Sequence, residues 1–184
     1  GGLMLAALLR ETGRSLSKQE AERIQRVHAE AYARQAPSLR VLPGASELLE
    51  VLRTYRVPHA IATSGRVQSA QHALKLLKLP KEMPVVTRDD VRFAKPDPDL
   101  FLAAAKRLHM PMNRCVIVGD SVWDLLAARR ALALSIGLLS GGYGREELER
   151  AGAYRVYQDP GDLLQHLDEV GLRIPVHTTQ LRRT

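Results

Sequence analysis

The sequence contains a single cysteine, Cys115, among its 184 residues. One thiol cannot build an internal disulfide framework, so the fold has to be stabilised by its core. Cys115 falls inside a predicted strand at residues 114–118, where it is most simply a small core side chain. Such sparse use of cysteine is typical of a reducing compartment, and we expect a cytoplasmic protein.

Long hydrophobic runs are also missing. No apolar stretch reaches the roughly 20 residues that a membrane-spanning helix needs. The opening residues Gly1–Met4 lack the basic region and apolar core of a signal peptide. We therefore expect no membrane partner. The composition, 45% hydrophobic and 26% charged residues, is ordinary for a globular protein whose length suits one domain with a small appendage.

Aromatic residues make up only 4% of the chain, whereas 27 basic residues against 20 acidic ones give a net charge of +7. A nucleic-acid surface would concentrate basic residues and interleave them with aromatic ones. Here the basic residues are dispersed along predicted helices, for example Arg23, Arg34 and Lys75. We expect no nucleic-acid partner. A solvated basic surface and a field that attracts anionic substrates both remain open.

The pattern of elements changes at residue 41. The first third predicts two helices, 3–11 and 17–36, and no strand; Ser17 and Glu20 form a capping-box pattern at the start of the second. Beyond residue 41, helices and strands alternate, which predicts an α/β fold with a Rossmann-like parallel sheet and helices on both faces. The predicted helices are 46–53, 66–77, 97–109, 121–130, 146–151 and 163–170, and the predicted strands are 58–63, 84–86, 114–118, 135–138 and 154–157. This divides the chain into a helical part (1–40), an α/β core (41–175) and a tail (176–184).

Two aspartates follow one predicted strand. The apolar run 116–118 stops at Gly119, and Asp120 and Asp124 come next at a spacing of four, with Ser121 placed to cap the following helix. In an open α/β sheet this is the edge where ligands bind. Two carboxylates held there suit Mg²⁺, which takes oxygen ligands and keeps several waters. Many such pairs only form a solvated helix face, but the position directly after a buried strand favours the metal site.

Polar groups also follow two other predicted strands. Thr63, Ser64 and Gly65 end one strand, where a hydroxyl and backbone N–H groups at the start of a helix can bind a phosphate oxygen. Lys95 lies in a proline-rich loop that anchors its ammonium, which can neutralise charge during phosphoryl transfer. Separately these residues could be a helix cap and an exposed lysine. Together with the aspartates they predict a phosphate site.

Three segments resemble the second, third and fourth motifs of the haloacid dehalogenase (HAD) superfamily: Ile61–Gly65, Ala94–Pro98 and Val118–Asp124. Their order and spacing match, and the resemblance extends over residues 41–170. Gly141–Gly144 resembles a loop of phosphoglycolate-phosphatase-like members. Residues 1–40 then resemble part of the all-helical cap of such proteins.

The resemblance implies a Mg²⁺-dependent phosphatase that acts on a small phosphorylated substrate through an aspartyl-phosphate. Carried over to this sequence, Thr63 would hold a phosphoryl oxygen with help from the Ser64 and Gly65 backbone. Lys95 would bridge the nucleophile and the phosphate. Asp120 would ligate Mg²⁺, directly or through water, and Asp124 would complete or orient that site.

One family motif has no counterpart. The superfamily's first motif, Asp-x-Asp-Gly-Thr at a strand end, supplies the nucleophile and the general acid/base, yet no Asp-x-Asp precedes the cap-like helices here. The only such pattern, Asp97–Asp99, opens a predicted helix. We therefore expect a relative that lacks its N-terminal segment, with little or no turnover from this chain alone. We also expect a gap, a substitute strand or a partner chain in the sheet, and a homo-oligomer is one way to cover the exposed surface.

Two other functions remain open. A sugar-phosphate mutase of the β-phosphoglucomutase type would use the same site, but that group usually has an acidic residue where this chain has Gly119, which favours the phosphatase. A non-catalytic binding module could keep the fold and lack the chemistry. The substrate itself cannot be deduced from the residues.

Overall fold

The computed structural model describes residue 13 and residues 15–173. Contacts within the chain divide it into two compact units, residues 1–40 and 41–184, which are described separately. The predicted helix at 3–11 and the predicted tail at 176–184 lie outside the described residues. Among those described, none of the helices combines the length and hydropathy that a membrane crossing requires.

The first unit contains helix α2 (Lys18–Gln35) and a 3₁₀ helix (Ala36–Ser38). The predicted capping box is present, since Ser17 Oγ accepts from Glu20 N and the Glu20 carboxylate accepts from Ser17 N at 2.8 Å. The side chains of Ile24 and Val27 stay exposed. The predicted range of this helix, 17–36, agrees with both ends of α2 to within one residue.

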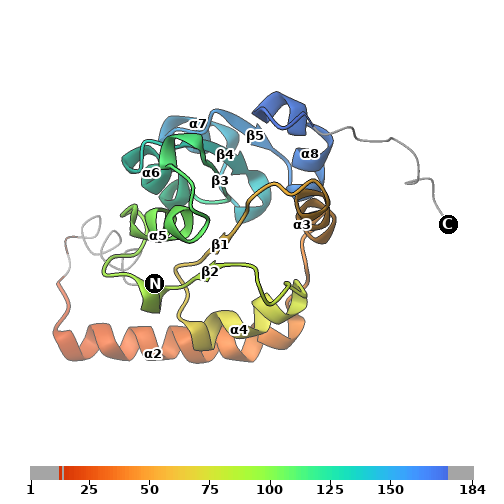
Figure 1. The fold of residues 1–184 in the computed structure, drawn as a ribbon. Coiled ribbons are helices and arrows are strands. Elements are labelled where there is room, and N and C mark those ends of the chain that lie inside the picture. The colour runs from red at the N-terminus through yellow and green to blue at the C-terminus, as the bar shows by residue number, and fades with distance from the viewer. Residues whose placement is uncertain (1–12, 14, 174–184) are drawn as a thin grey trace. The chain divides into compact units, whose positions relative to one another are not determined.

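The second unit is an α/β structure in which every strand pair is parallel (Figure 1). This confirms the predicted fold class. Its strands are β1 (Ile61–Ala62), β2 (Val85–Val86), β3 (Val116–Gly119), β4 (Leu134–Leu138) and β5 (Arg155–Tyr157). Its helices are α3 (Ala45–Thr54), α4 (Val67–Leu76), α5 (Asp99–Arg107), α6 (Val122–Arg130), α7 (Arg145–Ala151) and α8 (Pro160–Gln165), with 3₁₀ turns at Arg88–Asp90, Met112–Arg114, Leu139–Gly141 and Leu167–Val170.

Helices cover both faces of strands β4 and β5. On one face, Ile136 and Tyr157 pack against Leu163 of α8, and α3 joins the same cluster. On the other face, Leu148 of α7 packs with Val156 and with α6. Burial on both sides explains why Ser135, Ile136, Gly137 and Leu138 of β4 are all buried, although only Ile136 and Leu138 are apolar.

The strands form two sheets rather than the single sheet that the alternation predicted. Strand β1 pairs only with β2, and β3 pairs with β4, which pairs with β5. The two sheets meet the same helices: Phe101 of α5 packs with Ala127 and Ala128 of α6, and Ala62 of β1 and Ile117 of β3 both contact this cluster. Within the described ranges the sheet is therefore interrupted between β1 and β3, as the missing first motif led us to expect.

The interruption changes the burial of β3. We predicted a strand covered on both faces, but Val116 and Val118 are 40% and 44% exposed. That prediction is wrong because β3 lies at an edge of its sheet, and its burial depends on neighbours that hydrophobic periodicity cannot reveal.

Several predicted boundaries also need correction. The strand at 58–63 is only two residues long, because its partner β2 is equally short. The helix predicted to begin at residue 97 begins at Asp99 instead, and Asp97 N donates to Ala94 O in the turn before it. The helix predicted at 163–170 breaks at His166. Cys115 precedes β3 instead of lying within it, and it is only partly buried.

Candidate active site

The turn after β1 carries Thr63, Ser64 and Gly65. Thr63 N donates to Val86 O at 2.9 Å, which ties the end of β1 to β2, and Gly65 N donates to Thr63 Oγ1 at 3.1 Å. Thr63 is partly buried, whereas Ser64 is exposed. The hydroxyl of Thr63 is thus held at the carboxyl edge of β1, where a ligand can reach it.

The start of α4 is already partly occupied by an acidic side chain. Val67 N donates to Asp89 Oδ2 at 2.9 Å, so one backbone donor that we assigned to a phosphate is satisfied within the protein. Anion binding at this helix therefore depends more on the turn before it, residues 63–65, than on the helix N-terminus itself.

Lys95 connects two elements that are distant in the sequence. Its side chain is 15% exposed, and Nζ donates to Ala62 O at 3.2 Å and to Asp124 Oδ1 at 2.6 Å. The Lys95–Pro96 peptide is cis, and Arg130 of α6 donates to Pro96 O at 3.1 Å. The ammonium is consequently fixed beside the end of β1 and the first turn of α6.

Asp124 is buried, and both of its oxygens are bound. Oδ1 receives the Lys95 ammonium, while Oδ2 accepts from Ser121 N at 3.1 Å and from Ser121 Oγ at 2.6 Å. Ser121 in turn caps α6, as the sequence predicted. With its oxygens engaged in this way, Asp124 is better suited to orient Lys95 than to bind a metal through several contacts.

Asp120 lies between the end of β3 and α6. Burial raises the pKa of Asp120 above its ordinary value, the negative charge of Asp124 adds to the increase, and Lys95 opposes it. The single positive charge of Lys95 lies near two carboxylates, those of Asp120 and Asp124. A cation beside Asp120 would therefore reduce the repulsion between them. The oxygen donors therefore fit Mg²⁺, with Asp120 as the better-placed direct ligand.

The described part of the chain contains no group of three or more His, Cys, Asp or Glu side chains arranged to hold a metal ion. Mg²⁺ does not need one, since it commonly binds through one or two carboxylates and completes its shell with water and substrate oxygens.

The family follows from a comparison with known sequences. The model of the haloacid dehalogenase-like hydrolases matches residues 4–131. The chain belongs to this family. A phosphorylated carbohydrates phosphatase of Thermotoga maritima is 32% identical to this HAD-like hydrolase over 148 residues, which cover 79% of the chain and 68% of that relative.

Other relatives are matched over shorter regions. Hexitol phosphatase A of Escherichia coli is 34% identical over 65% of the chain and 54% of its own length. Validoxylamine A 7'-phosphate phosphatase of Streptomyces hygroscopicus is 35% identical over 55% of the chain and 48% of its own length. The chain thus spans about half the length of these two relatives.

Solved structures are similar over most of the HAD-like chain. A hydrolase from Pseudomonas syringae shares 55% sequence identity with a TM-score of 0.88, covering 92% of this chain and 78% of that one. A HAD family hydrolase from Deinococcus radiodurans, solved with bound phosphate and sodium, shares 27% identity with a TM-score of 0.68, covering 91% and 75%.

Sequence reasoning missed several contacts of the HAD-like site. Arg130 holds the Lys95 loop from the far end of α6, and Asp89 binds the start of α4 from another loop. Gly141 lies against Asp120, since a Cβ at Gly141 would fall 2.7 Å from the carbonyl carbon of Asp120. These pairs are 21–34 residues apart, so no pattern of neighbouring residues predicts them. Of Arg130, Asp89 and Gly141, only Gly141 was singled out from the sequence, because the run Gly141–Gly144 resembles a loop of family members.

Proposed function

We propose that this protein is a Mg²⁺-dependent phosphatase that acts on a small phosphate ester through an aspartyl-phosphate. The observation that carries the proposal is the Lys95 ammonium, bonded at once to Ala62 O and to Asp124 Oδ1. It brings a fixed positive charge to the strand end that presents Thr63. Membership of the HAD-like hydrolases and the phosphatase names of its relatives support the same reaction class.

The proposed roles follow from the contacts of each side chain. Thr63 Oγ1 and the backbone N–H group of Ser64 bind phosphoryl oxygens, and Gly65 N, which donates to Thr63 Oγ1, orients that hydroxyl. Lys95 neutralises the charge that develops on the phosphoryl oxygens. Asp124 positions Lys95. Asp120 is the Mg²⁺ ligand from this chain. When bound, Mg²⁺ would supply further charge neutralisation for the phosphoryl group.

The attacking carboxylate is proposed on grounds of family resemblance. It belongs to an Asp-x-Asp strand that these 184 residues do not contain, and the interruption between β1 and β3 is where such a strand could pair with both edges. We therefore propose that the 184 residues bind phosphate but turn over little or no substrate by themselves. The helical unit 1–40 is proposed to be part of a cap, and the protein to be cytoplasmic.

Gly119 favours the phosphatase over the mutase. A Cβ at this position would lie 2.6 Å from Cγ of Asp124, too close for any side chain without moving that aspartate. An acidic residue before Asp120, as β-phosphoglucomutase-type relatives usually have, does not fit this backbone.

Phosphate binding by the chain tests the site. We expect isothermal titration calorimetry to detect inorganic phosphate in the presence of Mg²⁺ and much weaker binding after chelation with EDTA. Lys95→Ala and Asp120→Asn should each weaken binding about tenfold or more, because each removes a charge-assisted contact. Lys106→Ala, which removes an exposed ammonium from α5, is the matched control and should bind as the unmodified chain does.

Hydrolysis separates the remaining alternatives. The complete gene product should hydrolyse p-nitrophenyl phosphate with Mg²⁺, and the 184-residue chain should not. Phosphate binding without hydrolysis by either protein would support the non-catalytic module instead. Equal loss of binding in Lys95→Ala and Lys106→Ala would argue against the site itself.

A further inference from the structure

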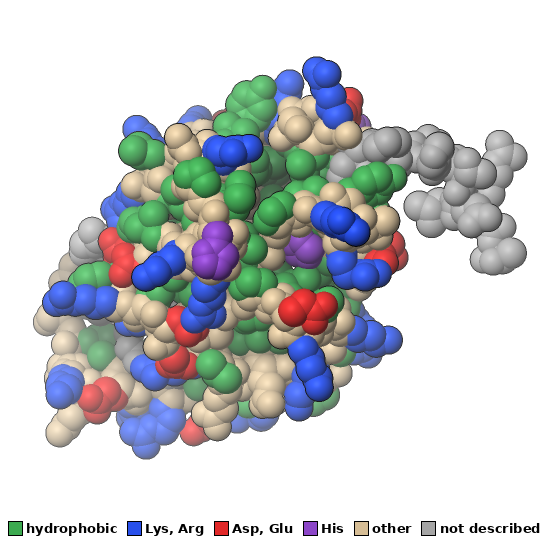
Figure 2. Space-filling view, in the orientation of Figure 1, with side chains coloured by type: hydrophobic (Ala, Val, Ile, Leu, Met, Phe, Trp, Pro, Cys, Tyr) green, Lys and Arg blue, Asp and Glu red, His purple; other side chains and the backbone are tan. Residues whose placement is uncertain are grey.

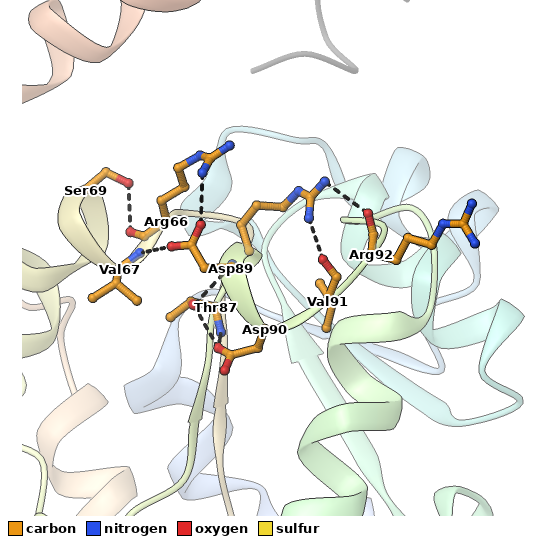
Figure 3. A network of polar contacts seen from close by, with 9 residues as sticks. Arg66, Val67, Ser69, Thr87, Asp89, Asp90, Val91 and Arg92 are labelled. Carbon is orange, nitrogen blue, oxygen red and sulfur yellow. Dashed lines mark hydrogen bonds and ion pairs between the residues drawn. The ribbon is translucent and has the colours of Figure 1, made fainter.

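The backbone that leads to Lys95 is held by polar contacts of the loop after β2, residues 87–93 (Figure 3). Asp89 joins this loop to the start of α4, because one of its oxygens accepts from Val67 N at 2.9 Å and the other from Arg66 Nη1 at 3.1 Å. These contacts fix the chain before Lys95, but none of them involves its ammonium. The position of the ammonium therefore depends on other neighbours.

The Lys95 ammonium contacts two oxygens and one aromatic ring. It donates to Ala62 O at 3.2 Å and to Asp124 Oδ1 at 2.6 Å. It also lies over the ring of Phe101, 5.2 Å from the ring centre. A lysine ammonium has three N–H donors, so the two bonds to oxygens within the described part of the chain leave one donor for a ligand. The ring adds a contact that neither oxygen supplies.

Phe101 is fixed by the packing of α5 against α6. It is 5% exposed and packs with Ala127 and Ala128 of α6. Its backbone N–H donates to Pro98 O at 2.9 Å at the start of α5. A ring that is packed in this way has a defined position, so it can define the position of a cation that lies over it.

An aromatic ring suits this place better than an aliphatic side chain. The Lys95 side chain is only 15% exposed, so its charge has lost much of its contact with water. The face of an aromatic ring carries partial negative charge and attracts a cation, and this attraction is stronger when the cation is desolvated. A leucine in place of Phe101 would fill much of the same volume but would offer no such attraction.

We propose that Phe101 is a positioning residue for Lys95. The face of its ring holds the ammonium beside Ala62 O and Asp124, so that the remaining N–H donor stays available to the phosphoryl group bound at Thr63. This inference rests on the proposed function, because Lys95 must bind the phosphoryl oxygens. Phe101 acts through Lys95, by limiting the positions that the ammonium can take before the ligand binds.

Fluorinated phenylalanines test the attraction at nearly constant shape. Fluorine withdraws electrons from the ring face, so para-fluoro-, meta-difluoro- and pentafluorophenylalanine, introduced at position 101 by stop-codon suppression, should weaken the attraction in steps. In calorimetry with Mg²⁺ and inorganic phosphate, we expect the affinity to fall at each step and by about threefold to tenfold in total. A residue that only fills the core would not produce this order, because all three analogues keep the ring and its packing.

Position 93 supplies the matched control. The Phe93 ring also lies near a cation, with the Arg92 guanidinium 5.0 Å from the ring centre, but Phe93 is 49% exposed. The same analogues at position 93 should leave phosphate affinity within about twofold, since an exposed pair of this kind is weak. Phe101→Leu should weaken phosphate binding at least as much as pentafluorophenylalanine does. It should also destabilise the fold through the cavity that it leaves, so the fluorinated series decides between the two roles.

The outcomes separate this inference from the function on which it rests. The same phosphate affinity for all three analogues at position 101, or an equal change at position 93, overturns the role of Phe101 and leaves the phosphate site standing. Failure of the unmodified chain to bind phosphate overturns both. Urea denaturation of each form measures stability, and a fall in affinity that only follows a fall in stability across the series also overturns the inference, because it would mark a packing effect.

Discussion

Asp124 shows how single atoms control this site. Its carboxylate joins Lys95 to Ser121, and the backbone of Gly119 packs against its side chain. Any side chain at position 119 would displace Asp124, and Lys95 would lose its oriented partner. The absence of a Cβ at Gly119 is therefore as important to the geometry as the charged residues.

Replacing Gly119 with alanine tests this close contact. We expect Gly119→Ala to lower the free energy of unfolding by about 1–3 kcal/mol through overpacking and to weaken Mg²⁺-dependent phosphate binding severalfold. Gly144→Ala is the control, since a Cβ there meets only the flexible Glu147 carboxylate at 3.4 Å. Urea denaturation and calorimetry measure both effects, and a Gly119→Ala variant that matches Gly144→Ala in both would contradict the argument.

At the scale of elements, capping signals predicted helices well. Ser17 and Ser121 begin their helices as expected, because capping depends on residues within one turn of each other. Strand lengths were predicted less well. The apolar run at 58–63 forms only a two-residue strand, since strand pairing depends on a partner 24 residues away.

The loop that follows β2 should make stability depend on pH. Hydrogen bonds from Thr87 lower the pKa of Asp90 from an ordinary 3.8 to about 2, and Arg107 contributes. A carboxyl group that is more acidic in the folded state stabilises the fold above pH 4, and this contribution is lost as the pH falls towards 2.

Replacing Asp90 tests that dependence. Asp90→Asn should lower the free energy of unfolding at pH 7 by about 1–2 kcal/mol, and the difference from the unmodified chain should shrink between pH 4 and pH 2. Asp168→Asn, at an exposed position of the 3₁₀ turn Leu167–Val170, serves as the control. Urea denaturation at several pH values measures the effect, and a difference that stays constant down to pH 2.5 would rule it out.

At the scale of the whole molecule, the interrupted sheet is the main structural feature of the α/β unit. Strands β1 and β3 contact the same helical cluster without pairing with each other. The apolar side chains of Val116 and Val118 are left exposed at this interruption. Charge, in contrast, is spread out: basic side chains are distributed over the face seen in Figure 2 among acidic and apolar ones, without forming one stripe.

The exposed strand should promote self-association. We expect the apparent mass of the 184-residue chain to rise with concentration, because an unpaired edge with apolar side chains favours pairing between copies. The double variant Val116→Thr/Val118→Thr should reduce this association. Val67→Thr, at an exposed valine on α4, is the control. Sedimentation velocity measures the effect, and a monomer at all concentrations would exclude it.

The sequence by itself determined the order and type of most elements, the α/β class and the three family segments. These features depend on local periodicity, on caps and on residues that directly follow strands. Only the tertiary structure decided that β1 and β3 do not pair, that Lys95 binds both Ala62 and Asp124, and that Asp89 orients Arg66. Each of these joins residues far apart in the chain, and such contacts form only when the elements have packed.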